Sequence, residues 1–221
     1  MLLCRRGFMA NEKYNENLIQ AKIRQAQTKK VSAASRSAKI SAPGQTVTSG
    51  WPILDLGVRP KFDQSTWTLA VDGEVENPII FSWAEFLKLP QTAITADFHC
   101  VTRWSRLNNH WEGVTFKALF ERVSPKPEAG FVIFGASDGY TTNVPMEDLL
   151  PDNCLLASKH DGEALPEEHG GPLRVIIPHL YGWKGAKWVN KITFSKNDAP
   201  GFWEVRGYHN HGIVEEEERY S

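Results

Sequence analysis

The sequence has few cysteines, no long apolar run and no excess of charge of either sign. Its 221 residues include three cysteines, Cys4, Cys100 and Cys154. None of them forms the CxxC spacing of a zinc site or a c-type haem attachment. Because an odd, sparse set of cysteines does not build a disulfide framework, we expect a reducing, cytoplasmic location. The net charge of −1 gives no indication of nucleic-acid binding.

A membrane span and an export signal are also missing. No stretch approaches the roughly 18 apolar residues that a transmembrane helix requires. The segment Arg5–Phe8 superficially resembles a twin-arginine signal, but polar residues from Asn11 to Asn15 stand where an apolar segment should follow. We therefore reject export and expect no membrane span.

Charge is unevenly distributed along the chain. Residues 1–45 hold nine Lys/Arg against two Asp/Glu, a net charge of +7, and the remainder holds sixteen against twenty-four, a net charge of −8. We expect residues 1–44 to form a basic, flexible tail with one marginal helix over Leu18–Ile23. A docking arm for an acidic partner is the functional alternative. The remaining residues, 45–221, have the length of one domain.

Alternation of apolar and polar residues predicts strands through most of this domain. Ile94, Ala96, Phe98 and Cys100 share one face of such a strand. Further strands are expected over residues 67–71, 131–134, 140–144, 155–158, 173–177 and 188–194, with a turn at 111–113. Short helices are expected after Ser82, where Glu85 completes a capping box, and after Thr115. Many strands with few short helices indicate a β-rich α+β domain.

Cys100 is the residue whose surroundings suggest chemistry. It ends the predicted strand, and Arg103 and Arg106 follow it. Positive charge favours the thiolate, which is the form of cysteine that binds metals or attacks electrophiles. The alternative is a small apolar core residue, and the spacing alone leaves both interpretations open.

Four ordered motifs add a family resemblance. FHCVTRWS followed by WEGV, then DGYTTNVP, HGGPLRVIIPHLYGWKGAKWV and GFWEVRGYHNHG, closely resemble the sulfite oxidase-like molybdopterin oxidoreductases. The nearest match is the small single-domain bacterial branch, and the resemblance covers Gln45 to the C-terminus. It implies a sulfite oxidase-type molybdopterin-binding fold with short helices around mixed sheets.

The resemblance also implies the residues that bind the cofactor. Cys100 matches the thiolate ligand of molybdenum, whereas Cys154 stands where the family has an apolar core residue. Without the resemblance, Arg174 would be interpreted as a surface ion pair, and the basic turn with Lys184 as a solvated loop. The positions that match pterin and phosphate contacts are His169, Arg174, Gly185, Ala186, Lys187 and, less directly, Ser137.

Substrate residues are less well defined by the motifs. Arg103 and Arg106 are candidates for holding an anionic substrate, although their spacing does not reproduce the arginines of the sulfite oxidases. Either could instead pair with a carboxylate as structural support. Further candidates for the pocket are His99, Trp104, Asn109 and His110, and His209 and His211, close to Tyr208, are candidates for its mouth. A lone histidine is more often a structural group.

The resemblance implies a molybdenum–molybdopterin oxidoreductase that moves an oxygen atom or two electrons to or from a small substrate. The substrate is a sulfite-like anion or an S- or N-oxide, and the direction stays open. We expect the plain pterin without a nucleotide, a separate electron-transfer partner, no nucleic acid and a monomer. The alternative is a non-catalytic carrier of the molybdenum cofactor.

Overall fold

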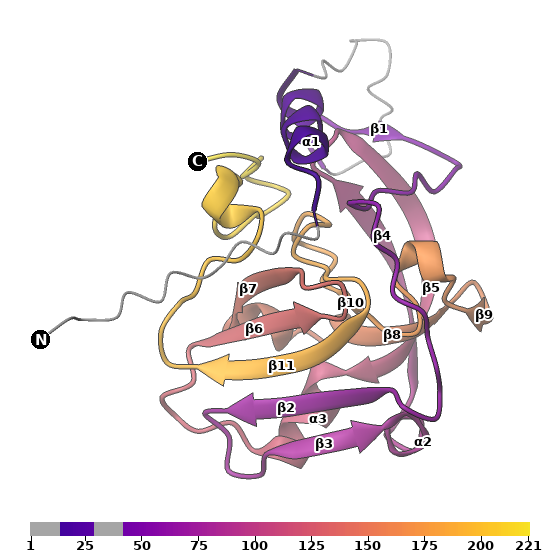
Figure 1. Cartoon of the computed structure of the whole chain (residues 1–221), viewed down its shortest axis with the longest axis vertical. Helices are drawn as coiled ribbons and strands as arrows, with labels where there is room; N and C mark the ends of the chain where they lie inside the picture. The colour runs from indigo at the N-terminus through magenta and orange to yellow at the C-terminus, as the bar shows by residue number, and fades with distance from the viewer. Residues whose placement is uncertain (1–13, 29–41) are drawn as a thin grey trace, which may run out of the picture.

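Two β-sheets make up most of the protein. The computed structural model describes residues 14–28 and 42–221, and Figure 1 shows the chain. The larger sheet has six strands, β1 (Thr46–Val47), β4 (Thr92–Cys100), β5 (Trp104–Thr115), β8 (Leu155–His160), β9 (Glu163–Ala164) and β10 (Arg174–Ile176). The second sheet has five strands in the order β3 (Ile79–Ser82), β2 (Thr68–Gly73), β11 (Val189–Ser195), β6 (Phe131–Ala136) and β7 (Thr141–Pro145).

Both sheets mix parallel and antiparallel neighbours. β1 lies parallel to β5 and β2 lies parallel to β11, whereas the other pairs are antiparallel. The helical segments are short, apart from the first: α1 (Glu16–Thr28), α2 (Trp83–Phe86), α3 (Phe116–Val123), η2 (Met146–Leu149), η3 (Glu167–His169) and η4 (Glu204–Arg206). The expectation of a β-rich α+β fold with mixed sheets is confirmed.

The main core lies between the two sheets. Side chains of β5 and β8 pack against those of β2, β6 and β11, and α3 adds Phe116, Leu119 and Val123 to the same cluster. The two predicted helix caps are present. Ser82 and Glu85 form the reciprocal capping box of α2, and the Thr115 hydroxyl accepts a hydrogen bond from the Ala118 N–H.

The turn expected at residues 111–113 is not present, because these residues continue β5 alongside β8. The register shifts at Gly113, where an added Cβ would collide with the Leu156 carbonyl oxygen. Glycine here allows the close approach of two strands and does not mark a turn. Trp111, the first of the three residues, is fully buried.

The N-terminal region differs more from expectation. α1 packs on the domain through Ala26, which is 0% exposed and joins an apolar cluster of the domain, and Ile19 of the same helix is 1% exposed, so residues 14–28 are not a flexible tail. The Tyr14 hydroxyl also donates a hydrogen bond of 3.0 Å to the carbonyl oxygen of Asp138. Burial of one apolar face outweighs the weak helical signal that the sequence shows. The rest of the predicted tail, residues 1–13 and 29–41, lies outside the described residues.

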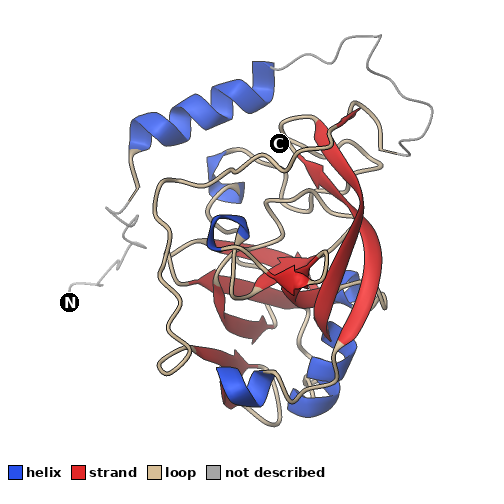
Figure 2. Cartoon of the chain, turned by 90° about the vertical axis from the view of Figure 1, so that its right-hand side faces the viewer, coloured by secondary structure: helices blue, strands red, loops and turns tan. Residues whose placement is uncertain are grey.

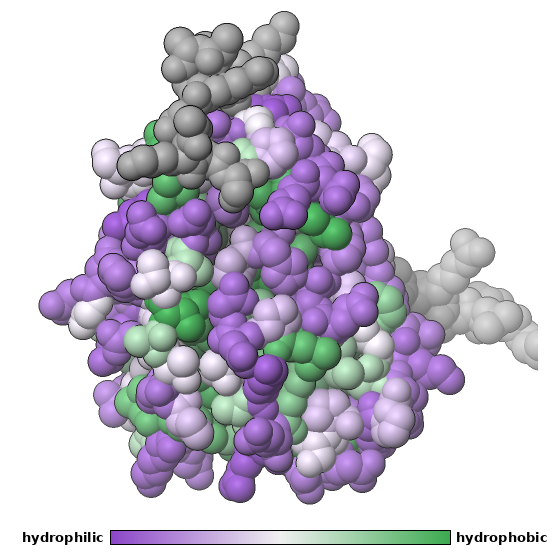
Figure 3. All heavy atoms as spheres, turned by 180° about the vertical axis from the view of Figure 1, so that it is seen from behind, coloured by the Kyte–Doolittle hydropathy of each residue, from purple (hydrophilic) through white to green (hydrophobic). Residues whose placement is uncertain are grey.

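The exposed apolar surface is limited, as expected for one folded domain. Figure 2 shows α1 lying across one end of the molecule, near the ends of the larger sheet. The face in Figure 3 is mainly hydrophilic, with small, separated apolar patches. Among the described helices, none combines the length and the apolar character needed to cross a membrane.

Candidate active site

A cavity of about 150 Å³ opens at the end of the larger sheet, beside the last residue of β4. Parts of the chain that are distant in sequence meet around it, among them α1, the segment 51–56, the end of β4, and the loop 182–188. The side chains that decide its chemistry are Lys22, Trp51, Cys100, His169, Arg174, Lys187 and Tyr208. The structure thus brings together most of the site residues predicted from the sequence.

Cys100 occupies the position expected from the alternation of the strand. It ends β4, is 6% exposed and lines the cavity, and its Sγ lies 3.1 Å from the Thr102 hydroxyl oxygen. The Gln45 side chain donates a hydrogen bond to the Cys100 carbonyl oxygen, which fixes the strand end. A soft sulfur ligand is therefore presented to the cavity from a rigid element.

Cys154 has a different environment. It is fully buried in the main core, and its thiol donates a hydrogen bond of 3.3 Å to the Asp148 carbonyl oxygen. Burial raises the pKa of this thiol to about 12, so it stays protonated. Its interpretation as a core residue is confirmed. Cys4 lies outside the described residues, and among the described cysteines only Cys100 lines the cavity.

Arg174 carries a buried positive charge beside the cavity. Its side chain is 2% exposed and donates hydrogen bonds to the carbonyl oxygens of His169 (2.9 Å) and Gly185 (3.4 Å). Its Nε has no hydrogen-bond partner and no carboxylate of the described residues forms an ion pair with it. Burial lowers its pKa to about 10, which still leaves it charged at neutral pH. The interpretation of Arg174 as a surface ion pair is excluded.

Lys187 places a second cation at the cavity. Its Nζ donates a hydrogen bond of 2.7 Å to the Glu168 carbonyl oxygen, and the described residues provide no ion pair for it. Burial, and then the charge of Arg174, lower its pKa to about 7. The adjacent backbone is closely packed: an added Cβ at Gly185 would lie 2.8 Å from the Val175 carbonyl oxygen. This loop therefore requires glycine to bring Lys187 and Arg174 to the same cavity.

His169 contributes a flat, neutral ring. It stacks on Trp51 with a centroid distance of 3.7 Å and an angle of 5° between the planes. Burial, followed by the charges of Lys187 and Arg174, lowers its pKa to about 4. It can therefore donate or accept a hydrogen bond at neutral pH but adds no charge. Trp51 was not predicted as a site residue, because nothing in the extended segment around Pro52 indicates which rings it will meet.

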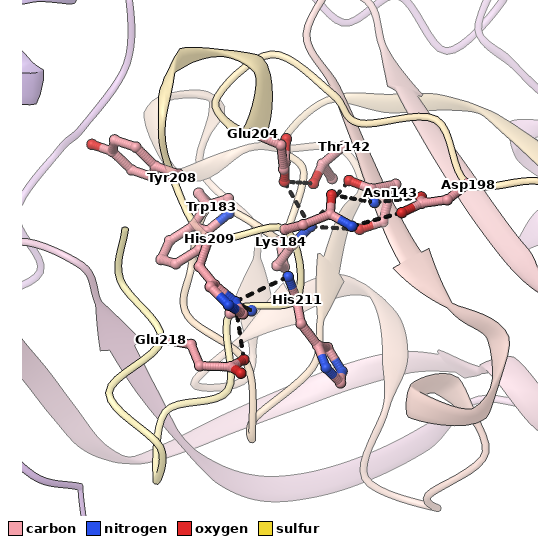
Figure 4. A network of polar contacts seen from close by, with 12 residues as sticks. Thr142, Asn143, Trp183, Lys184, Asp198, Glu204, Tyr208, His209, His211 and Glu218 are labelled. Atoms are coloured by element: carbon pink, nitrogen blue, oxygen red, sulfur yellow. Dashed lines mark hydrogen bonds and ion pairs between the residues drawn. The ribbon is translucent and has the colours of Figure 1, made fainter. Parts of the chain in front are cut away.

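The other lysine of the basic turn, Lys184, does not line the cavity. Lys184 is fully buried, and its Nζ lies 2.7 Å from the Glu204 carboxylate and donates a hydrogen bond of 2.8 Å to the Asn143 carbonyl oxygen. Figure 4 shows this network, in which Thr142 also donates to Glu204. Lys184 is therefore neither a solvated residue nor a cavity residue. Its contacts with Glu204 and Asn143 fix the loop 182–188 to the rest of the domain.

The structure does not bring Arg103 and Arg106 into the cavity. Arg103 lies in the turn between β4 and β5, with a positive φ of 66°, and pairs with Glu217 at 3.7 Å. Arg106 pairs with Asp161 at 2.8 Å and stands over the ring of Trp51. The turn and these ion pairs hold both guanidinium groups outside the cavity. Neither residue lines the cavity, and both form ion pairs of the kind that the alternative of structural support describes.

The remaining candidates divide in the same way. Trp104 lines the cavity, and so does Tyr208, which was not predicted as a site residue. Ser137 does not: its hydroxyl donates to the Trp188 carbonyl oxygen, and its neighbour Asp138 faces the cavity instead. His99 forms a hydrogen bond with Ser105 and His110 with Thr95, and His209 lies 3.1 Å from the Glu218 carboxylate. Asn109 forms hydrogen bonds with His160 and Arg106. His211 contacts Asp148 at 2.6 Å. The cavity is not lined by His99, Asn109, His110, His209 or His211.

The donor set fits a soft metal with an anionic group beside it. Cys100 offers sulfur, and Arg174 and Lys187 offer two cations that form no ion pair with a carboxylate of the described residues, although the charge of Asp55 acts on Lys187. An uncompensated buried charge is unfavourable unless a ligand of opposite charge completes it. A phosphate satisfies this requirement, because it accepts several charge-assisted hydrogen bonds.

Comparisons with known proteins agree with this chemistry. Residues 56–203 match the family model of the oxidoreductase molybdopterin-binding domain. The chain is 44% identical over 180 residues to the uncharacterized oxidoreductase YuiH of Bacillus subtilis, covering 81% of this chain and 91% of YuiH. It is 29% identical over 160 residues to the catalytic subunit of the protein-methionine-sulfoxide reductase MsrP of Campylobacter jejuni, covering 65% of this chain and 54% of MsrP.

A solved structure extends the likeness to the fold. The crystal structure of the sulfane dehydrogenase SoxCD from Paracoccus pantotrophus superposes with a TM-score of 0.56 and 26% identity, covering 63% of this chain and 40% of that one. The chain spans about half the length of the sulfoxide-reductase relatives that it matches.

Proposed function

The chain belongs to the family of oxidoreductase molybdopterin-binding domains, and from this premise we propose that it removes the oxygen atom of a small sulfoxide. The protein is an oxidoreductase, and its cofactor is molybdenum held by molybdopterin. When bound, this cofactor supplies the two-electron chemistry of oxygen-atom transfer. The reaction takes a sulfoxide, two electrons and two protons to a thioether and water.

One observation carries the proposal: a single cavity joins the Cys100 sulfur to two cations, Arg174 and Lys187, that form no ion pair with a carboxylate of the described residues. In this proposal Cys100 holds the metal, Arg174 and Lys187 bind the phosphate of the pterin, and His169 contacts the pterin. Gly185 and Ala186 place their backbone beside the same group. We retain the prediction of a pterin without a nucleotide.

Two observations favour a sulfoxide over a small anion such as sulfite. Relatives of the chain are protein-methionine-sulfoxide reductases by name. The two arginines that follow Cys100 are paired with Glu217 and Asp161 outside the cavity. Without a cluster of arginines beside the thiolate, the aromatic walls formed by Trp104 and Tyr208 suit a substrate with small apolar groups.

The phenol of Tyr208 can contribute a hydrogen bond to the reaction. It lines the cavity, and burial, together with the neighbouring Tyr220 and Cys100, raises its pKa. The phenol therefore stays protonated and can donate to the substrate oxygen. Loss of this donor should lower kcat more than it raises KM, because the bond strengthens as negative charge develops on the oxygen.

The second candidate function is oxidation of a sulfur compound, which the likeness to sulfane dehydrogenase favours. A cofactor carrier without turnover is the third. Electrons would come from a separate partner, as the relatives' designation as catalytic subunits suggests. A monomer in the cytoplasm remains our prediction for its state and location.

Dye-linked turnover tests the proposed function. The full-length protein, purified from a host competent in molybdenum cofactor synthesis, should oxidise a reduced viologen when dimethyl sulfoxide or methionine sulfoxide is added. Cys100→Ser should abolish this turnover while the protein stays folded. Turnover only in the oxidising direction, with sulfite and an electron acceptor, would replace the proposal with the second candidate. Bound molybdenum without turnover in either direction would favour the carrier.

A further inference from the structure

α1 contributes polar side chains to the Cys100 cavity although it lies outside the part of the chain that the family model matches. The match begins at residue 56, whereas Lys22 and Gln25 line the cavity from the helix Glu16–Thr28. Residues three apart on a helix share a face, so both side chains point to the cavity from one side of α1. The helix therefore adds a wall that the family-wide domain does not supply.

The helix is fixed in this position at three points. The Tyr14 hydroxyl donates to the Asp138 carbonyl oxygen, and the Tyr14 ring packs edge-on against Phe202 at 5.1 Å. Ala26 is fully buried in the same apolar cluster as Cys100 and Trp104. Figures 1 and 2 show α1 beside this end of the molecule from two directions. The position of Lys22 is thus set by contacts on both sides of it in the chain, at Tyr14 and at Ala26.

The ammonium group of Lys22 forms no hydrogen bond or ion pair with the described residues. The Asp55 carboxylate acts on it electrostatically, and Asp55 already binds Arg59 at 2.7 Å. Burial lowers the pKa of Lys22, and the charges of Asp55 and Cys100 oppose that shift. Lys22 also acts electrostatically on Lys187. A third cation thus faces a cavity that already holds Arg174 and Lys187.

We propose that α1 is part of the binding site and that Lys22 binds an anionic group held in the Cys100 cavity. The group is either the pterin phosphate or a negatively charged part of the substrate, since both would accept a hydrogen bond from an ammonium group. Identifying this group rests on the proposed function, but the requirement for an anion beside Lys22 does not.

The experiment compares Lys22→Gln with Arg24→Gln in the full-length protein. Arg24 lies on the same helix, is exposed and does not line the cavity, so the control removes the same charge from outside the site. Lys22→Arg keeps the positive charge and should therefore behave like the wild type. Three quantities are measured: molybdenum and pterin per chain, KM for two sulfoxides, and the midpoint of thermal unfolding. The sulfoxides are methylsulfinylacetate, an anion, and dimethyl sulfoxide, which is neutral.

We expect one of two results, which identify the source of the anion. If Lys22 binds the pterin phosphate, Lys22→Gln loses cofactor during purification and Arg24→Gln does not. If Lys22 binds the substrate, cofactor content is unchanged and KM for methylsulfinylacetate rises about ten- to thirtyfold, the lower part of the range for a hydrogen bond to a charged group. KM for dimethyl sulfoxide stays constant in that case.

The proposal is overturned if Lys22→Gln matches Arg24→Gln in cofactor content and in both KM values. It is also overturned if both KM values rise equally together with a lower unfolding midpoint, because that pattern indicates structural support. If the wild type does not turn over methylsulfinylacetate, the rise in unfolding midpoint that this anion causes replaces KM. Absence of all turnover contradicts the proposed function, while cofactor content and the midpoint still decide the role of Lys22.

Discussion

Two buried cations, Lys184 and Arg174, lie at the loop 182–188 and differ in whether a carboxylate pairs with them. Lys184 is compensated, since the Glu204 carboxylate lies 2.7 Å away and Asn143 accepts a further hydrogen bond. The Arg174 guanidinium donates hydrogen bonds to two backbone carbonyls and is surrounded by aromatic rings on several sides. No carboxylate of the described residues forms an ion pair with it. Burial of a charge is costly in both places.

This difference separates structural support from binding. A cation whose partner belongs to the chain stabilises the fold that contains it, whereas a cation without one is completed by a ligand. Residues of the cavity should therefore affect cofactor content and activity with little loss of stability. Residues of the Lys184 cluster should affect stability first, and function only through it.

The largest effect is expected for Cys100→Ser. The variant keeps the size of the side chain but removes the soft sulfur, so activity should fall by more than about a hundredfold, because even the indirect supports of metal ligands matter 10–100-fold. The unfolding midpoint should stay close to that of the wild type. Dye-linked turnover and thermal unfolding are the measurements. Wild-type turnover by the serine variant would remove Cys100 from the mechanism.

Glu204→Gln tests the buried ion pair between Lys184 and Glu204. It leaves the Lys184 charge buried without a counter-charge, so the free energy of unfolding should fall by about 3–5 kcal/mol. The Lys184→Met/Glu204→Leu double variant is the matched control and should lose much less, because it removes both charges. Denaturant unfolding measures both. An equal loss in the two variants would show that packing, and not charge pairing, gives this cluster its stability.

Arg174→Met should have the opposite signature. Without cofactor, in a host that does not make it, the variant should be as stable as the wild type or more stable by up to about 2 kcal/mol, because a buried charge is replaced by an apolar side chain. With cofactor, retention should weaken roughly tenfold or more, as expected for loss of a charged hydrogen bond. A large loss of stability in the cofactor-free protein would place Arg174 with Lys184 as structural support.

A further prediction concerns pH and Lys187. Its pKa is about 7 in the fold against an ordinary value of 10.5, so the unfolded chain binds more protons between these values. The stability of the cofactor-free protein should therefore rise with pH from about 7 to 10.5, as the burial cost of the ammonium group is relieved. Below pH 7 the full cost applies. Lys187→Met should show a shallower rise, and an unchanged slope would mean that Lys187 is not desolvated.

The sequence predicts the parts of the site that local pattern determines. Alternation from Ile94 to Cys100 places the thiol at a strand end, and the caps at Ser82 and Thr115 begin helices where they were expected. The motifs around His169 and Lys187 indicate which loops meet the cavity. These features depend on residues close together in the chain or on a resemblance carried by several motifs in order.

The parts that were missed depend on partners far away in the sequence. Nothing near Arg103 or Arg106 indicates that Glu217 and Asp161 will hold their guanidinium groups outside the cavity. The helix that carries Lys22 has a weak apolar face, and its burial depends on residues more than seventy positions later, such as Cys100. Long-range pairing of this kind is not encoded in local periodicity.

The most direct test of the account is the molybdenum and pterin content of the wild type and of an Arg174→Met/Lys187→Met double variant, both purified as full-length protein from a host competent in cofactor synthesis. The account predicts stoichiometric molybdenum and pterin in the wild type. It predicts strongly reduced content in the double variant, which should nevertheless remain folded with an unfolding midpoint no lower than that of the cofactor-free wild type. Full occupancy in the double variant would contradict the claim that these uncompensated cations bind the cofactor.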